Sequence, residues 1–287
     1  MKLFINIFTI LCSLVTLSVA DINNGQRDAF IMGCKDGITP KNMVSQISRL
    51  TDLGGDLRNI YHNHSSFLSS NEKFKETICS ELGDIIIEQP DLLAKVLLES
   101  NDRKEFSRTA SDLQAQLLNE YTSRGLRRMD GASTIPYFSY LKDSFIGADP
   151  LLCKLLMVGA GDLASDSYSL QSLMLKQQQK MPSERVRNYL ALTRTAIDVI
   201  INDIGENISL TSTDEITTGE EFGDYLFKYS ASFKNAERLA NMLSGNIQGT
   251  NKEYCDLGRL YYGALKTMPA PFGDRARELY FIMQGQP

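Results

Sequence analysis

Apolar residues recur along most of this chain at steps of three and four, the spacing that places side chains on one face of an α-helix. The most regular stretch follows Pro182-Ser183-Glu184 and is predicted to end at Gly205. Its repeating face is formed by Val186, Leu190, Thr193, Ile197, Ile200 and Ile204. Alternation with a period of two, which is typical of strands, is nearly absent, and the Thr-rich stretch 208–216 is interpreted as a loop. The pattern predicts an all-α protein.

Local signals predict where several helices begin and end. Thr39-Pro40 and Asp149-Pro150 each place a capping residue before a proline, which is favoured at the first helical position. Thr218 and Glu221 have the spacing of a capping box, and one helix is expected to follow them through residues 222–243. Glycines are predicted to end helices at Gly54-Gly55, Gly125, Gly205 and Gly245.

Each of these helices has one apolar face, which must be buried against its neighbours. About ten to twelve such segments imply a compact multi-helix bundle or an α-solenoid-like stack. The stretch Leu126–Ile135 shows no helical periodicity and is the best candidate for a boundary. We therefore expect residues 21–287 to form a single all-helical domain or two lobes, 21–130 and 131–287.

The first twenty residues have the layout of a secretory signal peptide. A cationic start, Met1-Lys2, precedes a mostly apolar run, Leu3–Leu17, and the small residues of Ser18-Val19-Ala20. This layout predicts cleavage after Ala20 and a secreted or periplasmic protein. The run is shorter than the ~20 apolar residues that a spanning helix needs, and no later segment is apolar enough to span a membrane.

Loss of Cys12 with the leader would leave an even number of cysteines, as expected for disulfides in an exported chain. Three pairings are possible for them. We favour Cys34–Cys79 and Cys153–Cys255, because each bridge would close one half of the chain. The fold is therefore expected to be disulfide-braced. A zinc site fits less well, because the four cysteines are far apart and form no C-x-x-C pair.

Charge and motifs narrow the function classes. The net charge of −5 argues against a nucleic-acid partner, since phosphate binding needs a basic surface. The sequence contains no G-x-S-x-G, H-E-x-x-H, Walker or EF-hand motif. No cofactor and no metal are expected.

The only two histidines, His62 and His64, lie in a segment predicted to be helical. Residues two apart on a helix point in nearly opposite directions, so the pair is not expected to chelate a metal. His64 is the one candidate general base, and it would need a carboxylate to orient it. A structural or surface role is the favoured interpretation.

Two further groups of residues have both a functional and a structural interpretation. Gly159–Ala164 fits the G-x-G-x-x-A pattern of dinucleotide binding, but the preceding residues look helical, so a turn between helices is favoured. The carboxylates of Glu220, Glu221 and Asp224 are candidate catalytic groups. Glu220 and Glu221 are equally expected in a first helical turn, where the helix dipole favours acidic residues.

Two polar clusters are predicted to be solvated. The arginines Arg124, Arg127 and Arg128 could bind an anion or mark a processing site, but a solvated loop is favoured. The run Gln177–Gln179 is predicted to be an exposed helix end.

These observations favour a non-enzymatic exported protein that binds another protein or a component of the cell envelope. The first alternative is a secreted all-α hydrolase that uses carboxylates or His64, since catalytic groups can converge in space without a local motif. The second alternative is a carrier of apolar ligands, because helical bundles can hold ligands between their helices.

Overall fold

The computed structural model describes residues 31–32, 34–44, 53–88, 117–158 and 167–284. Within these ranges the chain folds into helices joined by turns and loops, with no strand, so the all-α prediction is confirmed. The longer helices are α3 (Gly55–Ser70), α4 (Glu72–Glu88), α7 (Ile135–Ser144), α8 (Pro150–Val158), α9 (Ser167–Lys180), α10 (Ser183–Ile201), α11 (Ser212–Ser230), α12 (Ala236–Leu243), α13 (Asn251–Thr267) and α14 (Phe272–Gln284). The predicted leader, residues 1–20, lies outside the described residues.

The chain divides between Tyr121 and Thr122 into an N-terminal unit and a C-terminal unit. In the N-terminal unit α3 packs against α4, and the Asn71 side chain between them accepts a hydrogen bond from the backbone N–H of Phe74 at 2.9 Å. A helical run starts at Pro40 as predicted, because the Thr39 hydroxyl accepts from the backbone N–H of Asn42 at 3.2 Å.

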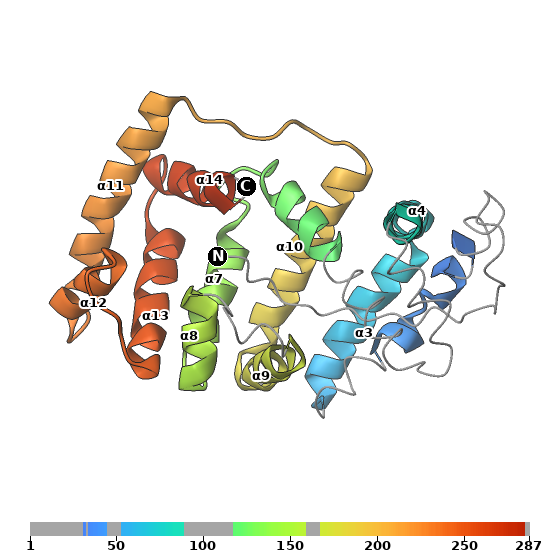
Figure 1. Cartoon of the computed structure of the whole chain (residues 1–287), viewed down its shortest axis with the longest axis horizontal. Coiled ribbons are helices and arrows are strands. Elements are labelled where there is room, and N and C mark those ends of the chain that lie inside the picture. Colours follow the sequence, from blue (N-terminus) through green and yellow to red (C-terminus); the bar gives the residue numbers. More distant parts are fainter. Residues whose placement is uncertain (1–30, 33, 45–52, 89–116, 159–166, 285–287) are drawn as a thin grey trace. The chain divides into compact units, whose positions relative to one another are not determined.

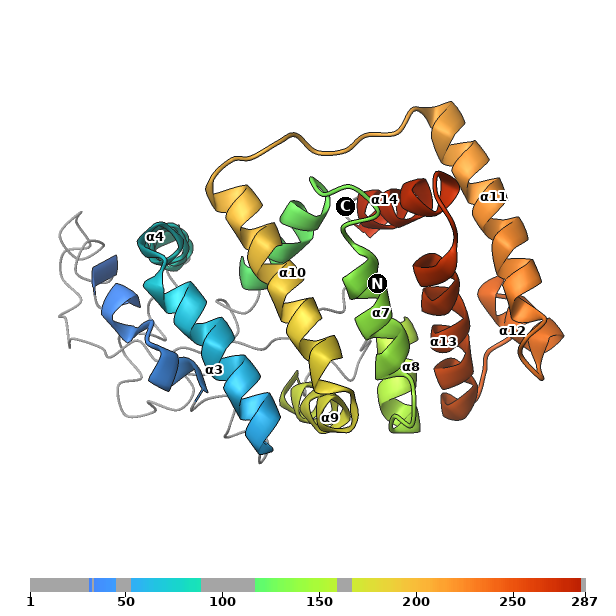
Figure 2. The ribbon, with the colours of Figure 1, turned by 180° about the vertical axis from the view of Figure 1, so that it is seen from behind.

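In the C-terminal unit α13 is the central element. It contacts α7, α8, α11, α12 and α14. Figures 1 and 2 show α11, α13, α7 and α10 side by side in a row, and α14 crosses near one end of α13. Helix α11 lies at the outer end of this row, so only one of its sides meets the rest of the unit.

Aromatic side chains fill the space where α7, α10, α13 and α14 meet. The Tyr137 and Phe281 ring centroids are 5.1 Å apart, and Tyr140 stacks on Tyr189 at 4.0 Å. Burial raises the pKa of the Tyr137 hydroxyl well above its usual range, because this environment disfavours the phenolate. These tyrosines therefore serve as neutral core residues.

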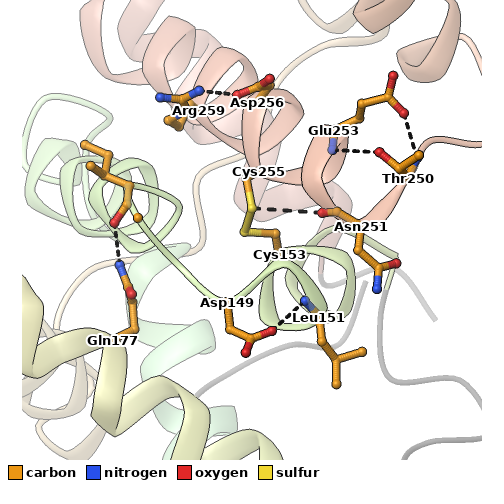
Figure 3. Close-up of a disulfide and its surroundings, with 12 residues drawn as sticks. Asp149, Leu151, Cys153, Gln177, Thr250, Asn251, Glu253, Cys255, Asp256 and Arg259 are labelled. Atoms are coloured by element: carbon orange, nitrogen blue, oxygen red, sulfur yellow. Dashed lines mark hydrogen bonds and ion pairs between the residues drawn. A yellow bond between two sulfur atoms is a disulfide. The ribbon is translucent and has the colours of Figure 1, made fainter.

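Both disulfides join the predicted cysteines: Cys34 to Cys79 and Cys153 to Cys255. The second bridge links α8 to α13 close to the first turn of each helix (Figure 3). Asp149 caps α8 by accepting from the backbone N–H of Leu151 at 2.8 Å, as predicted. Capping and bridging together fix these two helix starts.

The start of α13 carries a capping box formed by Thr250 and Glu253 (Figure 3). The Glu253 carboxylate accepts hydrogen bonds from Arg238 and from the backbone N–H of Thr250. The Arg238 guanidinium and this backbone N–H lower the pKa of Glu253 to about 2. The cap therefore stays charged over most of the acidic range.

The stabilisation that Glu253 contributes is expected to depend on pH in a defined direction. Its pKa is lower in the folded protein than the ordinary value of 4.5, so the contribution is complete above pH 4.5 and is lost as the pH falls towards about 2. Circular dichroism can follow the unfolding of the parent and of the Glu253→Gln variant from neutral to acidic pH. The difference between their free energies of unfolding should shrink as the pH falls from 4.5 towards about 2. A difference that stayed constant with pH would contradict the assignment.

Gly125 does not end its helix as predicted, because the helical segment continues to Leu126. A Cβ atom at Gly125 would lie 2.0 Å from the backbone oxygen of Ala196 in α10. The glycine is required because two helix backbones approach closely here, which a single sequence does not reveal.

Gly125→Ala is expected to lower the free energy of unfolding by about 1–3 kcal/mol, since the backbone of α10 would have to move. Gly55→Ala is the matched control, because a Cβ there meets nothing within 4 Å. Urea unfolding of both variants tests this, and equal stabilities would show that the close approach is not rigid.

The prediction that Gln177–Gln179 is an exposed helix end is wrong for its first two residues. Gln177 and Gln178 are 2% and 1% exposed. The Gln177 side-chain amide donates to the backbone oxygen of Ile146 at 2.8 Å, and that of Gln178 donates to the Tyr140 hydroxyl at 2.6 Å. These tertiary partners allow the polar run to be buried.

Candidate functional site

The two histidines lie on different sides of α3. His64 is 2% exposed and faces the core of the N-terminal unit, whereas His62 is exposed to solvent. The helix separates them as the sequence predicted. Within the described ranges, no group of three or more His, Cys, Asp or Glu side chains could hold a metal ion. The role of His64 as a general base stays a prediction.

The glycine-rich motif, residues 159–164, lies outside the described residues. The residues before it form the end of α8, Pro150–Val158, so a helix leads into the motif as predicted. A dinucleotide fingerprint instead follows a strand.

Two residues of the arginine cluster, Arg127 and Arg128, contact a segment that is distant in sequence. The Arg128 guanidinium pairs with the carboxylate of Asp203 at 2.8 Å. The backbone oxygen of Arg127 accepts a hydrogen bond from the N–H of Ile208 at 2.8 Å. These contacts fasten the turn after the helical segment 117–126 to the segment that follows α10, so the turn has a structural function.

The predicted start of the helix that carries the candidate carboxylates is wrong. Helix α11 begins at Ser212, because the Thr211 hydroxyl accepts from the backbone N–H of Asp214 at 3.1 Å. Thr218, the predicted cap, is a buried residue inside the helix. Glu220 and Glu221 therefore lie in the middle of α11 rather than in its first turn, and the dipole does not account for them. The helix also ends at Ser230, so residues 222–243 do not form one helix.

One side of α11 is anchored to the C-terminal unit. The Tyr225 hydroxyl donates to the hydroxyl of Thr267 at 3.1 Å. A Cβ at Gly263 would lie 2.6 Å from the Tyr229 hydroxyl, so this glycine makes room for the Tyr229 side chain. At the start of the helix Asp214 pairs with Arg275 of α14 at 3.4 Å.

The opposite side of α11, here called the α11 outer face, is open to solvent. Ile216 and Phe227 are 63% and 74% exposed, and they lie three turns apart on the same side of the helix. Along that side, at successive steps of four, three and four residues, lie Ile216, Glu220, Gly223 and Phe227. Gly219 and Asp224 lie on the two flanks of this row. The face is therefore apolar at both ends and acidic in the middle.

The two glycines of this face have no local function in the folded chain. A Cβ at Gly219 or at Gly223 would meet nothing within 4 Å. Glycine inside a helix costs about 0.5–1 kcal/mol relative to alanine, because its backbone loses more freedom on folding. The α11 outer face thus leaves a length of helix backbone bare at a cost in stability.

Gly219→Ala and Gly223→Ala are each expected to raise the free energy of unfolding by about 0.5–1 kcal/mol. The gain follows because the new methyl group reduces the freedom of the unfolded chain and touches nothing in the folded one. Urea unfolding measures it, with Gly263→Ala as the destabilised control. A loss of stability at Gly219 or Gly223 would mean that the face is already covered.

The sequence interpretation missed this face because it placed Ile216 in a loop. Thr211 and Asp214 have the spacing of a helix cap. A helix that begins directly after Thr211 includes Ile216 and places it on the same side as Phe227. No helix in the described ranges is both long and apolar enough to cross a membrane. Comparison with known protein families, curated proteins and solved structures finds no match to this chain.

Proposed function

We propose that this protein is an exported, non-enzymatic binding protein whose interface is the α11 outer face. The observation that carries the proposal is the pair of exposed apolar side chains, Ile216 and Phe227, on one side of a helix that is anchored by its other side. Single exposed apolar residues are common on protein surfaces. Here two of them lie in one row on the same side of α11, and Gly223 adds no side-chain bulk between them.

Export is supported by the leader-like start of the sequence and by the two disulfides. Structural disulfides persist in oxidising compartments and are rare in the reducing cytosol. The intact mass of the native protein without reductant tests this part. We expect the mass of residues 21–287 with two disulfide bonds, and a mass that retains Met1 with four thiols would overturn it.

The interface is tested by comparing two double variants. Ile216→Ser with Phe227→Ser removes the apolar ends of the α11 outer face. Ile204→Ser with Met283→Ser removes two apolar side chains of similar exposure elsewhere, which are 56% and 64% exposed in the parent. Both changes affect solvent-exposed side chains, so both variants are expected to fold, which circular dichroism checks.

Each protein is immobilised and exposed to the extracellular and envelope fractions of its own source, and the captured proteins are quantified by mass spectrometry. We expect a captured protein that depends on Ile216 and Phe227 but not on Ile204 and Met283. Identical capture by all three proteins would contradict the assignment of the interface.

A further inference from the structure

We propose that the partner at the α11 outer face is a basic amphipathic helix whose contacting row carries small side chains. This inference rests on the proposed function and adds the chemistry of the partner to it.

The charge of α11 is strongly one-sided. Its sequence contains five acidic residues and one basic residue, Lys228. Glu220 and Asp224 are exposed on the outer face, and Glu221 is exposed beside it. A partner that covers this face brings these carboxylates towards lower dielectric, where they need cations. Lysine or arginine on the flanks of the partner helix supplies them.

The bare backbone at Gly219 and Gly223 determines how the partner packs. Glycines four residues apart on one side of a helix allow another helix to approach more closely than side chains permit. A partner helix that uses this closer approach needs glycine, alanine or serine at the facing positions. Ile216 and Phe227 lie on either side of this approach and can pack against larger apolar residues of the partner.

The length of the face sets the size of the partner segment. Ile216 and Phe227 are eleven residues apart in sequence, which corresponds to about 16 Å along the helix axis. A helix of at least about twelve residues is needed to contact both ends.

A second copy of the chain is a poorer occupant. Antiparallel pairing of two α11 outer faces would bring Glu220 and Asp224 of both copies together at the centre, where like charges repel. An anionic lipid surface is disfavoured for the same reason. A basic helix is the partner that gains from these acidic groups.

Synthetic helical peptides of about twenty residues test the inference with the disulfide-bonded full chain. The probe carries alanine and leucine on one face and lysine on both flanks. One control peptide replaces each lysine with glutamate, and another scrambles the order so that no apolar face remains. Fluorescence anisotropy measures binding between about 0.05 M and about 0.5 M salt. We expect binding of the lysine peptide alone, weakening as salt rises.

Variants of the chain separate this inference from the proposed function. Glu220→Lys with Asp224→Lys should weaken binding of the lysine peptide about tenfold, and Gly223→Ala should weaken it while raising stability. Ile216→Ser with Phe227→Ser should abolish it. If the charge variant binds the lysine peptide like the parent, or if the parent fails to bind it, the partner chemistry is overturned.

The proposed interface has its own readout in this experiment. If the lysine peptide binds the Ile216→Ser, Phe227→Ser variant as tightly as the parent, the α11 outer face is not the binding site. Sedimentation velocity of the chain alone tests whether a second copy of the chain binds the α11 outer face. A dimer that dissociates in the Phe227→Ser variant would keep the interface and replace the basic helix with a second copy.

Discussion

Replacing Arg277 with methionine is expected to destabilise the C-terminal unit by about 3–5 kcal/mol, one of the two largest effects predicted for this protein. The Arg277 side chain is 2% exposed and lies in α14. Its Nε donates to the backbone oxygen of Gly131 at 2.8 Å, and one terminal nitrogen donates to that of Leu265 at 2.6 Å. The other terminal nitrogen pairs with the carboxylate of Asp274 at 2.6 Å.

The size of the effect follows from what methionine would leave behind. Methionine fills a similar volume but donates no hydrogen bond, so the backbone oxygen of Leu265 would lose its donor inside the core. The backbone oxygen of Gly131 would keep only its hydrogen bonds from Thr134. Each unsatisfied buried acceptor costs about 1–3 kcal/mol. The loss would also separate three segments that Arg277 joins, namely the turn before α7, the end of α13 and the start of α14.

Denaturant unfolding of Arg277→Met measures this loss, and Arg275→Met is the matched control. Arg275 lies two residues away in the same helix but is 44% exposed, and its pair with Asp214 spans 3.4 Å. An exposed pair of this kind contributes at most about 1 kcal/mol. Equal losses in the two variants would show that the buried hydrogen bonds of Arg277 are not what stabilises the unit.

Helices with a regular apolar face and a local start signal could be predicted from the sequence. Helix α10 follows Pro182 as expected, and Val186, Leu190 and Ile197 of its repeating face are buried. Its predicted end was placed too late, because the helix ends at Ile201 and Ile204 is 56% exposed. Periodicity identifies the face of a helix more reliably than its last turn.

Features that depend on partners distant in sequence could not be predicted. Arg277 is an ordinary charged residue until the backbone oxygens around it are known. Gln178 can be buried because the Tyr140 hydroxyl accepts its side-chain N–H. The role of Gly125 likewise depends on the backbone of Ala196, which belongs to another helix.

The α11 outer face depends partly on local signals that the sequence shows and partly on contacts between distant segments. Its cap at Thr211 and its spacing from Ile216 to Phe227 are local signals, and they could have been recognised in the sequence. Which side of α11 is open depends on where α13 and α14 pack, and no local signal contains that information. The candidate site therefore needed the tertiary structure, although each of its residues is visible in one short segment.

Removal of the Cys153–Cys255 bridge is the second large effect predicted. The bridge closes a loop with a sequence separation of 102 residues, and in the chain-entropy model such a loop contributes about 4.7 kcal/mol by restricting the unfolded chain. Changing both cysteines to alanine avoids a buried lone thiol, since Cys153 is fully buried. Urea unfolding without reductant should show this loss for the double variant.

The Cys34–Cys79 bridge provides the comparison, because its separation of 45 residues predicts a contribution of about 4 kcal/mol to the N-terminal unit. Adding reductant to the parent should reproduce both losses, and adding it to a variant that lacks all four cysteines should change nothing. If the variant without Cys153 and Cys255 unfolded at the same urea concentration as the parent, the packing of α8 against α13 would be sufficient on its own. The disulfide would then not be needed for stability, and only its presence, not its contribution to folding, would support an oxidising compartment.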